Sequence, residues 1–220
     1  MRNISYVIAL LFGVFVSESS FAQLSLLRDN GTGNPIMTNP YTEVKGTQYI
    51  NEFRQGTLYL ANGQKVDGLQ IALNGYENTL EYKLEGNLYS YSPENLPGFS
   101  FVNESGQVEE FTSEFTIPTL SQKRFLKKLE SGKYGLYLYP FKIMTDDVGS
   151  TYGAQASKVF QSQEDLFIVK DGKMVLLKTK TKDMQVIFGD DFEKANAIIK
   201  EQKLNLKNQE DVRVLIRQLN

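Results

Sequence analysis

The 220-residue chain contains no cysteine, no histidine and no tryptophan. Without cysteine it has no disulfide framework, no thiol nucleophile and no thiolate ligand for zinc or an iron–sulfur cluster. Without histidine it has no imidazole general base for a Ser-His-Asp triad and no histidine-bound metal. Aspartate and glutamate are the conventional acid and base groups that remain. We therefore expect no cofactor and assign no metal ligand.

A charge excess of either sign is also missing. The chain has 24 Lys plus Arg against 26 Asp plus Glu, a net charge of −2. Proteins that bind nucleic acid usually carry a basic excess, so we expect no nucleic-acid partner. A hydrophobic content of 41% argues against a disordered chain. The length fits one substantial domain or two small ones.

Long apolar runs are lacking, and the one short run lies near the N-terminus. Arg2 precedes the apolar stretch Tyr6–Val16. A membrane-spanning helix needs about 20 apolar residues. The stretch is typical of a signal peptide, with Ser20 and Ala22 as the small residues before a cleavage site ahead of Gln23. The alternatives are an N-terminal membrane anchor or a buried helix. We expect residues 1–22 to be removed from an exported protein, periplasmic or extracellular, with no transmembrane segment afterwards.

The next part of the chain changes from irregular to β-like. Residues 23–45 are rich in Asn, Gly, Thr and Pro without apolar periodicity, which predicts an irregular lead-in. From residue 46 to about 180, apolar and polar residues alternate, and turn dipeptides recur about every ten residues. Asn62-Gly63 and Asp171-Gly172 are typical hairpin turns, because their residues tolerate positive φ. The pattern predicts an antiparallel meander.

The pattern also predicts which side chains face inward in one strand and where a later strand is bent or at an edge. In the predicted strand 79–84, Leu80 and Tyr82 face inward, and Glu81 faces outward. Residues 121–132 fit either a helix or one arm of a hairpin that leads into the β-prone stretch Tyr134–Ile143, and we favour the hairpin. Pro140 has no amide donor, so that strand should be bent or lie at an edge there.

The last 40 residues have helical periodicity. Asp190 and Glu193 have the spacing of a capping box, which would open a helix that buries Phe192, Ala195 and Ile199. Asn208 precedes a second helix, whose apolar face is Val212, Leu215, Ile216 and Leu219. A third short helix is predicted around residues 182–188. Strands followed by segregated helices predict an α+β fold. We expect a single domain over residues 46–220, in which two or three short C-terminal helices (about 182–220) pack on an antiparallel sheet.

Part of the chain resembles a known group of proteins. Between Gly46 and Lys83, the residues that carry the resemblance are Tyr49, Phe53, Gly56, Gly63, Gly68, Asn74, Tyr76 and the run Leu80-Glu81-Tyr82-Lys83. With the Phe-Ala-Gln junction and the terminal helix pair, they are similar to exported β-rich proteins of unknown function from Bacteroidota. Gln218-Leu219 stands where that group has two tyrosines. The resemblance implies a source and a fold, and it carries over no catalytic residue.

Lysines form one candidate binding site. Lys178, Lys180 and Lys182 alternate with threonines, so in a strand their ammonium groups would face one side. An anionic partner, such as a lipid headgroup, a lipopolysaccharide phosphate or an acidic glycan, could bind there. The alternative is the solvent face of an edge strand, where lysine discourages aggregation.

Tyrosines form a second candidate. Tyr137 and Tyr139 share one face of a predicted strand and could stack on sugar rings or line an apolar groove. The alternative is packing across the sheet.

Carboxylates are the third candidate group. Asp146-Asp147 in a loop, or the cluster Asp190, Asp191 and Glu193, could hydrolyse a glycoside if two carboxylates faced each other. A solvated turn and a helix cap are the respective alternatives, so we assign no catalytic residue.

Together these features predict an exported, non-enzymatic, β-rich cell-envelope protein with a binding or scaffolding role. Its expected partner is an anionic envelope component or another envelope protein. The alternatives are a carboxylate-based hydrolase of envelope polymers and a carrier of an apolar ligand. Two facing carboxylates in a cleft would favour the hydrolase, and the residues to locate are Asp146, Asp147, Glu109, Glu110 and Glu114.

Overall fold

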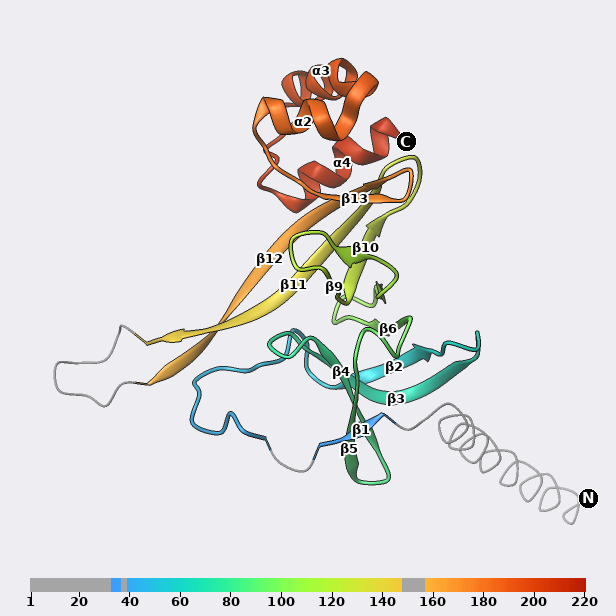
Figure 1. Ribbon diagram of the computed structural model, residues 1–220, viewed down its shortest axis with the longest axis vertical. Helices are drawn as coiled ribbons and strands as arrows, with labels where there is room; N and C mark the ends of the chain where they lie inside the picture. The colour runs from blue at the N-terminus through green and yellow to red at the C-terminus, as the bar shows by residue number, and fades with distance from the viewer. Residues whose placement is uncertain (1–32, 37–38, 148–156) are drawn as a thin grey trace, which may run out of the picture.

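The computed structural model of the protein describes residues 33–36, 39–147 and 157–220 (Figure 1). The expected signal peptide and its cleavage site ahead of Gln23 lie outside the described residues. The strands are β1 (Asn34–Pro35), β2 (Arg54–Tyr59), β3 (Lys65–Asn74), β4 (Thr79–Leu84), β5 (Asn87–Tyr91), β6 (Gly98–Val102), β7 (Val108–Thr112), β8 (Thr116–Ile117), β9 (Gln122–Lys123), β10 (Leu126–Glu130), β11 (Gly135–Asp146), β12 (Lys158–Lys170) and β13 (Lys173–Leu176). The helices are α2 (Thr181–Phe188), η1 (Gly189–Asp191), α3 (Phe192–Gln202) and α4 (Gln209–Leu219). Within the described residues, no helix has both the length and the apolar character needed to cross a membrane.

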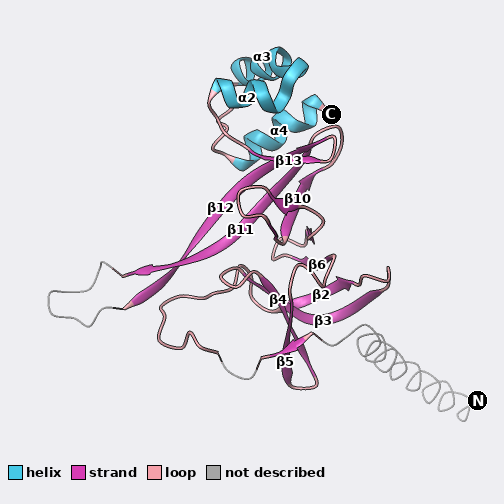
Figure 2. Ribbon diagram, in the orientation of Figure 1, coloured by secondary structure: helices cyan, strands magenta, loops and turns pink. Residues whose placement is uncertain are grey.

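Eleven strands form one antiparallel sheet in the order β1-β5-β4-β3-β2-β6-β7-β10-β11-β12-β13, and β8 and β9 form a separate ribbon. The helices gather at one end of the molecule (Figure 2), where α4 contacts β10 and β11. The structure therefore confirms the predicted α+β fold of an antiparallel sheet with C-terminal helices packed on it. Pairing of β1 with β5 and of β2 with β6 makes the sheet more than a simple meander.

The hairpin dipeptides form turns where the sequence predicts them. Gly63 has a φ of +82° between β2 and β3. Asp171 and Gly172 have φ values of +50° and +73°, and Lys170 pairs with Lys173 across them. Positive φ at both central residues is the type I′ geometry that matches strand twist. These turns fix the register of the strands that they join.

Residues 121–132 contribute to a hairpin and not to a helix, as favoured from the sequence, because β10 pairs with β11. Strand β11 also pairs with β12 in unbroken register from Gly135 to Asp146. Pro140 lies beyond the last residue of β11 that pairs with β10, Leu138, so β11 has one neighbouring strand there. The missing amide of Pro140 costs least at such an edge, and the expected edge position is confirmed.

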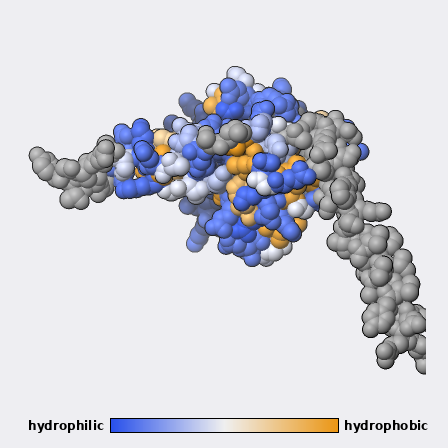
Figure 3. Space-filling view, turned by 90° about the horizontal axis from the view of Figure 1, so that it is seen from below, coloured by the Kyte–Doolittle hydropathy of each residue, from blue (hydrophilic) through white to orange (hydrophobic). Residues whose placement is uncertain are grey.

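Alternating side chains of β2–β7 form the core of the N-terminal half. On β4, Leu80 and Tyr82 are fully buried, which confirms the predicted inward face. The buried members of this core are Leu58, Leu60, Val66, Leu69, Ile71, Leu73, Leu80, Tyr82, Tyr91, Leu96, Phe99, Phe101, Phe111 and Phe125. Seen from below the view of Figure 1, the surface is largely hydrophilic, with hydrophobic side chains gathered near its centre (Figure 3).

The sheet of the C-terminal half, β10–β13, is covered on both faces. Leu136 and Ile168 pack beneath the helices, against a cluster that includes Leu215. Tyr137 and Phe167, the neighbours of Leu136 and Ile168 along β11 and β12, point to the opposite face and pack with Ile117 of the ribbon. Successive residues of a strand point to opposite faces, so each strand supplies both layers.

The helices bury the predicted apolar residues with one difference. In α4, Val212, Leu215, Ile216 and Leu219 are all buried. Asn208 caps this helix, because its Oδ1 accepts hydrogen bonds from the backbone N–H groups of residues 210 and 211. In α3, the third buried residue is Ile198 and not Ile199.

The predicted capping box at Asp190 is wrong. The residue that precedes α3 is Asp191, and its side chain makes no capping hydrogen bond. The Asp191 carboxylate instead accepts a hydrogen bond from the Tyr134 hydroxyl at 2.6 Å and pairs with Lys133. Lys133 and Tyr134, in the turn that precedes β11, hold the Asp191 carboxylate in place of a local cap, and η1 provides the entry to the helix.

The long hairpin β11–β12 reaches the N-terminal half and holds the segment that precedes β2. The backbone N–H of Phe160 donates to the carbonyl of Lys45 at 3.0 Å. The rings of Tyr41, Tyr76 and Phe160 meet edge to face with centroids 5.2–5.5 Å apart. The expected irregular lead-in is therefore partly ordered into the sheet where it is described, since β1 also pairs with β5.

Candidate functional site

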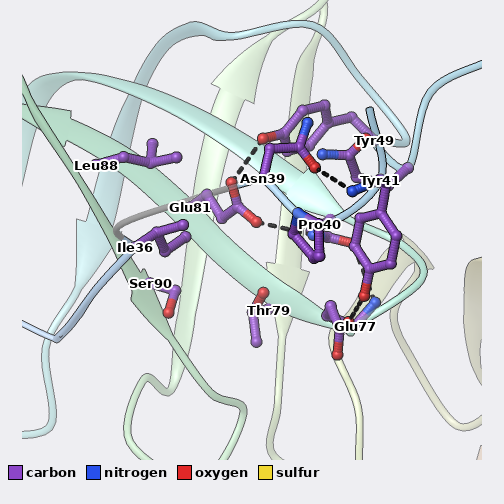
Figure 4. A pocket seen from close by; sticks show the side chains of 12 residues that line it. Ile36, Asn39, Pro40, Tyr41, Tyr49, Glu77, Thr79, Glu81, Leu88 and Ser90 are labelled. Atoms are coloured by element: carbon purple, nitrogen blue, oxygen red, sulfur yellow. Dashed lines mark hydrogen bonds between the residues drawn. The ribbon is translucent and has the colours of Figure 1, made fainter. Parts of the chain in front are cut away.

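A pocket of about 410 Å³ lies over the outer face of β4 and β5, under the segment that leads into β2 (Figure 4). Its lining residues are Ile36, Asn39, Pro40, Tyr41, Gln48, Tyr49, Asn74, Glu77, Thr79, Glu81, Leu88 and Ser90. We call this cavity the Tyr49–Glu81 pocket. Glu81 and Ser90 are directly opposed in the β4–β5 register, so both side chains leave the sheet on the pocket side.

Glu81 is the most deeply buried ionisable group of this pocket, with 4% of its surface exposed. One carboxylate oxygen accepts the Tyr49 hydroxyl at 2.7 Å, and the other accepts Nδ2 of Asn74 at 2.8 Å. Among the residues that the structure describes, no Lys or Arg forms a salt bridge with Glu81. The pocket thus contains a buried carboxylate whose hydrogen-bond donors are both neutral.

Asn74 connects Glu81 to the turn between β3 and β4. It is 3% exposed, and its Oδ1 accepts the backbone N–H groups of Tyr76 and Glu77 at 3.1 and 3.0 Å. Its amide therefore uses the oxygen to shape the turn and the nitrogen to hold Glu81. This arrangement positions the second carboxylate of the pocket, that of Glu77.

Tyr41 closes the pocket at Glu77. Its hydroxyl donates a hydrogen bond to the Glu77 carboxylate, and its backbone N–H donates to Oδ1 of Asn39 at 3.0 Å. The edge-to-face contact between Tyr41 and Phe160 supports the ring from the long hairpin. One wall of the pocket therefore depends on residues from both halves of the molecule.

Both tyrosine hydroxyls keep their protons at neutral pH. Burial raises the pKa of Tyr49, and the hydrogen bond to Glu81 raises it further, while a hydrogen bond with Gln48 lowers it. Burial, followed by the hydrogen bond to Glu77, raises the pKa of Tyr41. Each hydroxyl is thus a hydrogen-bond donor to a carboxylate.

The charge of the lining is one-sided. Glu77 and Glu81 supply two carboxylates, and none of the described residues that line the pocket is Lys or Arg. Ile36, Pro40 and Leu88 add apolar surface beside these acceptors. Such a pocket suits a ligand that combines hydrogen-bond donors with an apolar portion, and a positively charged donor would gain most from it.

The expected lysine stripe on a strand is wrong. Strand β13 ends at Leu176, Lys178 lies in the segment that follows, Lys180 is the N-cap of α2, and Lys182 lies in its first turn. All three lysines are exposed. Alternation of Lys and Thr fits a strand locally, but the apolar residues Met184, Ile187 and Phe188 bury one side of a helix and set the period instead.

Tyr137 and Tyr139 do not form an exposed stacking platform, because each is 8% exposed. The ring of Tyr137 meets that of Phe115 edge to face, and the ring of Tyr139 stacks on that of Phe141. Their pairing along one strand face reflects packing under the β8–β9 ribbon. Binding by these two rings therefore has no support from their surroundings.

The carboxylates considered for hydrolysis do not line the Tyr49–Glu81 pocket. Three of them have lysine partners: Asp147 pairs with Lys45 at 2.6 Å, Asp146 with Lys158 at 3.5 Å and Glu109 with Lys127 at 2.7 Å. In the described part of the chain, no group of three or more acidic side chains is placed to hold a metal ion.

The sequence places Glu81 on the outward face of its strand but does not predict its burial. The outward position is correct, and the covering segment of residues 39–49 removes it from water. The local sequence offers one signal for the burial of Glu81, namely that turn-rich stretches containing tyrosine flank its strand. Many strands on protein surfaces have the same pattern, so this signal is weak.

Comparison of the chain with protein-family models, with curated proteins and with solved structures finds no match. The geometry of the site is therefore the basis for inferring the function of the protein.

Proposed function

We propose that the protein is an exported, non-enzymatic cell-envelope protein that binds a ligand carrying an ammonium or guanidinium group in the Tyr49–Glu81 pocket. Small amines and the Lys or Arg side chains of another envelope protein have this chemistry. The single observation that carries the proposal is the buried carboxylate of Glu81, which has two neutral donors and no cationic partner within the described residues.

Burial of a carboxylate costs several kcal/mol unless hydrogen bonds or an opposite charge compensate. Tyr49 and Asn74 supply two hydrogen bonds, and each carboxylate oxygen can accept a further one. A cationic N–H donor would use this free capacity and offset the remaining cost. The second carboxylate, Glu77, would add to the attraction at the other side of the pocket.

Export is supported by the sequence alone. The positive Arg2, the apolar stretch Tyr6–Val16 and the small residues Ser20 and Ala22 have the order of a signal peptide. The resemblance to exported proteins of Bacteroidota points in the same direction. An envelope location would bring the pocket into contact with amines and with basic proteins of that compartment.

A binding role fits the pocket better than hydrolysis does. A glycosidase needs one carboxyl group that keeps its proton to serve as a general acid. Glu77 and Glu81 each accept a hydrogen bond from a tyrosine hydroxyl, so in both contacts the carboxyl group is the acceptor and not the donor. Two acceptor carboxylates are suited to holding a cationic N–H donor.

The proposal is tested by titration calorimetry of the protein lacking residues 1–22, with agmatine and putrescine as cationic probes at low salt. We expect one-site binding that is weakened about tenfold or more by Glu81→Gln, which keeps the shape of the side chain and removes its charge. Glu94→Gln, at an exposed position outside the pocket, is the matched control. Circular dichroism and the melting temperature of each variant verify that the fold is kept.

Failure of both probes to bind would contradict the proposal. Equal affinities of Glu81→Gln and the unmodified protein for a probe would contradict it as well. Calcium chloride is titrated in parallel. Stoichiometric binding of calcium, without binding of the amines, would identify a metal site instead. Release of reducing sugar from envelope polysaccharide, abolished by Glu77→Gln, would support the hydrolase alternative.

A further inference from the structure

We propose that a second site, at β13, the last strand of the sheet in the described residues, binds a single-chain anionic amphiphile with its acyl chain in an apolar groove and its carboxylate at Lys178, Lys180 and Lys182. This site lies in the C-terminal half and is independent of the Tyr49–Glu81 pocket. The groove has a volume of about 440 Å³ and is lined by Pro118, Thr119, Phe167, Met174, Val175, Leu176, Lys178, Asp183, Val186 and Ile187. We call it the β13 groove.

The groove exists because two layers separate at the edge of the sheet. Strand β13 is the last strand of the sheet order. On one face, the β8–β9 ribbon covers Phe167 and Met174, and on the other face α2 buries Ile187 with the other helices. Residues from both layers meet at β13, because Pro118 and Thr119 line the groove from the loop of the ribbon and Val186 and Ile187 line it from α2.

Val186 indicates that this apolar surface lacks a cover within the described residues. It lies on α2 and is 79% exposed, and Val175 of β13 is 39% exposed. Val186 lies between Met184 and Ile187, whose side chains are buried, so it extends the apolar surface of α2 outward. Isolated exposed valines are ordinary, but two that line the same groove form a continuous apolar wall.

The chemistry at the end of the groove specifies an anion. Lys178 and Asp183 line both the groove and a neighbouring hollow formed by residues 177–183, which also includes Lys180 and Lys182. Three lysines against one aspartate give this segment a net charge of +2, in a chain whose net charge is −2. A carboxylate placed there would meet positive charge beside an apolar groove.

The first turn of α2 adds hydrogen-bond donors at the same place. Its N-cap is Lys180, whose side chain has no acceptor, and no side-chain cap bond is present. The first backbone N–H groups of the helix therefore have no capping oxygen, and such groups favour an anion. Asp183, in the same turn, opposes the anion and limits its affinity.

The size of the groove selects one acyl chain and not a membrane surface. Its volume lies in the range of about 300–1,000 Å³ that is typical of small-molecule sites. Docking on a bilayer would require a broad, flat basic face, whereas Lys178, Lys180 and Lys182 lie in one short segment, with Lys178 in the groove lining and the other two in the neighbouring hollow. A fatty-acid carboxylate matches both the apolar length and the single anionic end.

The test uses dodecanoate below its critical micelle concentration, with dodecanol as the uncharged probe of the same chain length. Methionine methyl groups labelled with ¹³C report the location, because Met174 lines the groove and Met144 lies on β11 near its far end. We expect dodecanoate to shift the Met174 methyl resonance and leave that of Met144 in place. We also expect dodecanol to bind about tenfold more weakly.

Variants separate the two parts of the site. Val186→Asp should weaken dodecanoate binding about tenfold or more, since it places an unpaired charge beside the chain. Val108→Asp, at a valine that is 70% exposed on β7, is the matched control. Replacing Lys178, Lys180 and Lys182 together with Gln should weaken binding about tenfold and remove its salt dependence, whereas Asp183→Asn should strengthen it.

The triple replacement of Lys194, Lys200 and Lys203 with Gln, on and after α3, controls for total charge and should leave binding unchanged. Equal binding of dodecanol and dodecanoate, no shift at Met174, or no effect of Val186→Asp would each overturn the proposal. A second copy of the chain could occupy the β13 groove instead of an amphiphile, and sedimentation analysis tests for such a dimer. A dimer that Val186→Asp dissociates would also overturn the amphiphile proposal.

Discussion

The side-chain amide of Asn220 hydrogen-bonds to both backbone groups of Tyr134. Its Oδ1 accepts from the Tyr134 N–H at 2.7 Å, and its Nδ2 donates to the Tyr134 carbonyl at 3.1 Å. The same Nδ2 donates to the carbonyl of Ser131 at 3.2 Å. One side chain thus fixes the end of α4 against the turn between β10 and β11. A Cβ atom at Gly132 would come within 2.5 Å of Asn220, which leaves glycine as the residue that fits this contact.

Replacing Asn220 with Asp should destabilise the protein, because a carboxylate oxygen cannot donate to the carbonyls of Ser131 and Tyr134. We expect a loss of about 1–3 kcal/mol in the free energy of unfolding, measured by urea denaturation. Asn95→Asp, at an exposed position, makes the same chemical change and should alter stability by less than about 0.5 kcal/mol. A smaller loss for Asn220→Asp than for the control would contradict the structural role of Asn220.

Leu215 should contribute strongly to stability, because its side chain is completely buried in the helix–sheet core. Leu215→Ala should cost about 2–5 kcal/mol once the cavity is included. Truncation after Lys207 removes the whole of α4 and should leave a protease-sensitive protein. An unchanged melting temperature after truncation would show that α4 is dispensable.

The control for Leu215 must be chosen from the structure. From the sequence, Arg217→Ala is expected to be nearly neutral because Arg217 lies off the apolar stripe. Its guanidinium, however, lies 2.6 Å from the carboxylate of Glu130. Lys200→Ala, at an exposed position of α3, is the better control and should change stability by less than about 0.5 kcal/mol.

Glu130 should make stability depend on pH in the acid range. Burial raises its pKa, but hydrogen bonds from Arg217 and Arg213 outweigh burial and hold the pKa below its usual value of 4.5. A folded-state pKa below the unfolded value gives stability that is present above pH 4.5 and is lost as the pH falls through the folded value. Glu130→Gln should therefore be less stable than the unmodified protein at pH 7, by about 1.5–3 kcal/mol.

The difference between Glu130→Gln and the unmodified protein should shrink below about pH 4.5, as measured by urea denaturation across the acid range. Glu210→Gln is the control, because Glu210 pairs with Arg213 at an exposed site and loss of such a pair should change stability by about 0–1 kcal/mol at pH 7. A difference between the Glu130 variant and the unmodified protein that is constant from pH 7 to pH 3 would contradict this account.

Cleavage ahead of Gln23 is the prediction for the N-terminus. The mass of the exported protein should correspond to a chain that begins at Gln23, and Ala22→Asp should block processing because a small residue is needed before the cut. An exported product that begins at Met1 would contradict both cleavage and the proposed export route.

Features that depend on neighbouring residues, such as turns and helix caps, are predicted from the sequence. Burial by a segment that is distant in the sequence is not. Turns such as Asp171-Gly172 and the cap Asn208 depend on residues within a few positions, so the sequence states them directly. Glu81 shows the limit. A period of two assigns its face of the strand correctly, yet the segment that buries that face lies about 40 residues earlier in the chain.

The candidate sites show the same limit. Lys178, Lys180 and Lys182 are spaced for a strand, but α2 begins at Thr181, between the second and third lysine, and changes the period. Tyr137 and Tyr139 share a face as expected, and the β8–β9 ribbon, whose strands are each two residues long, covers that face. A ribbon of this length has too few residues for its position to be predicted from periodicity.

The support that Phe160 gives to Tyr41 sets an order of events as the chain is made. Residues 39–49 are synthesised early, but Lys45 forms hydrogen bonds with residues far along the chain. Its side chain binds Asp147, 102 residues further on, and its backbone binds Lys158 and Phe160. The contacts of Tyr41 with Tyr76 and Glu77 are local to the N-terminal half, but the outer wall of the Tyr49–Glu81 pocket lacks its contacts with β12 until the second arm of the long hairpin is present. Contacts between such distant segments form late and slowly. Complete assembly of the pocket wall therefore requires residues 158–160, which lie nearly three-quarters of the way along the 220-residue chain.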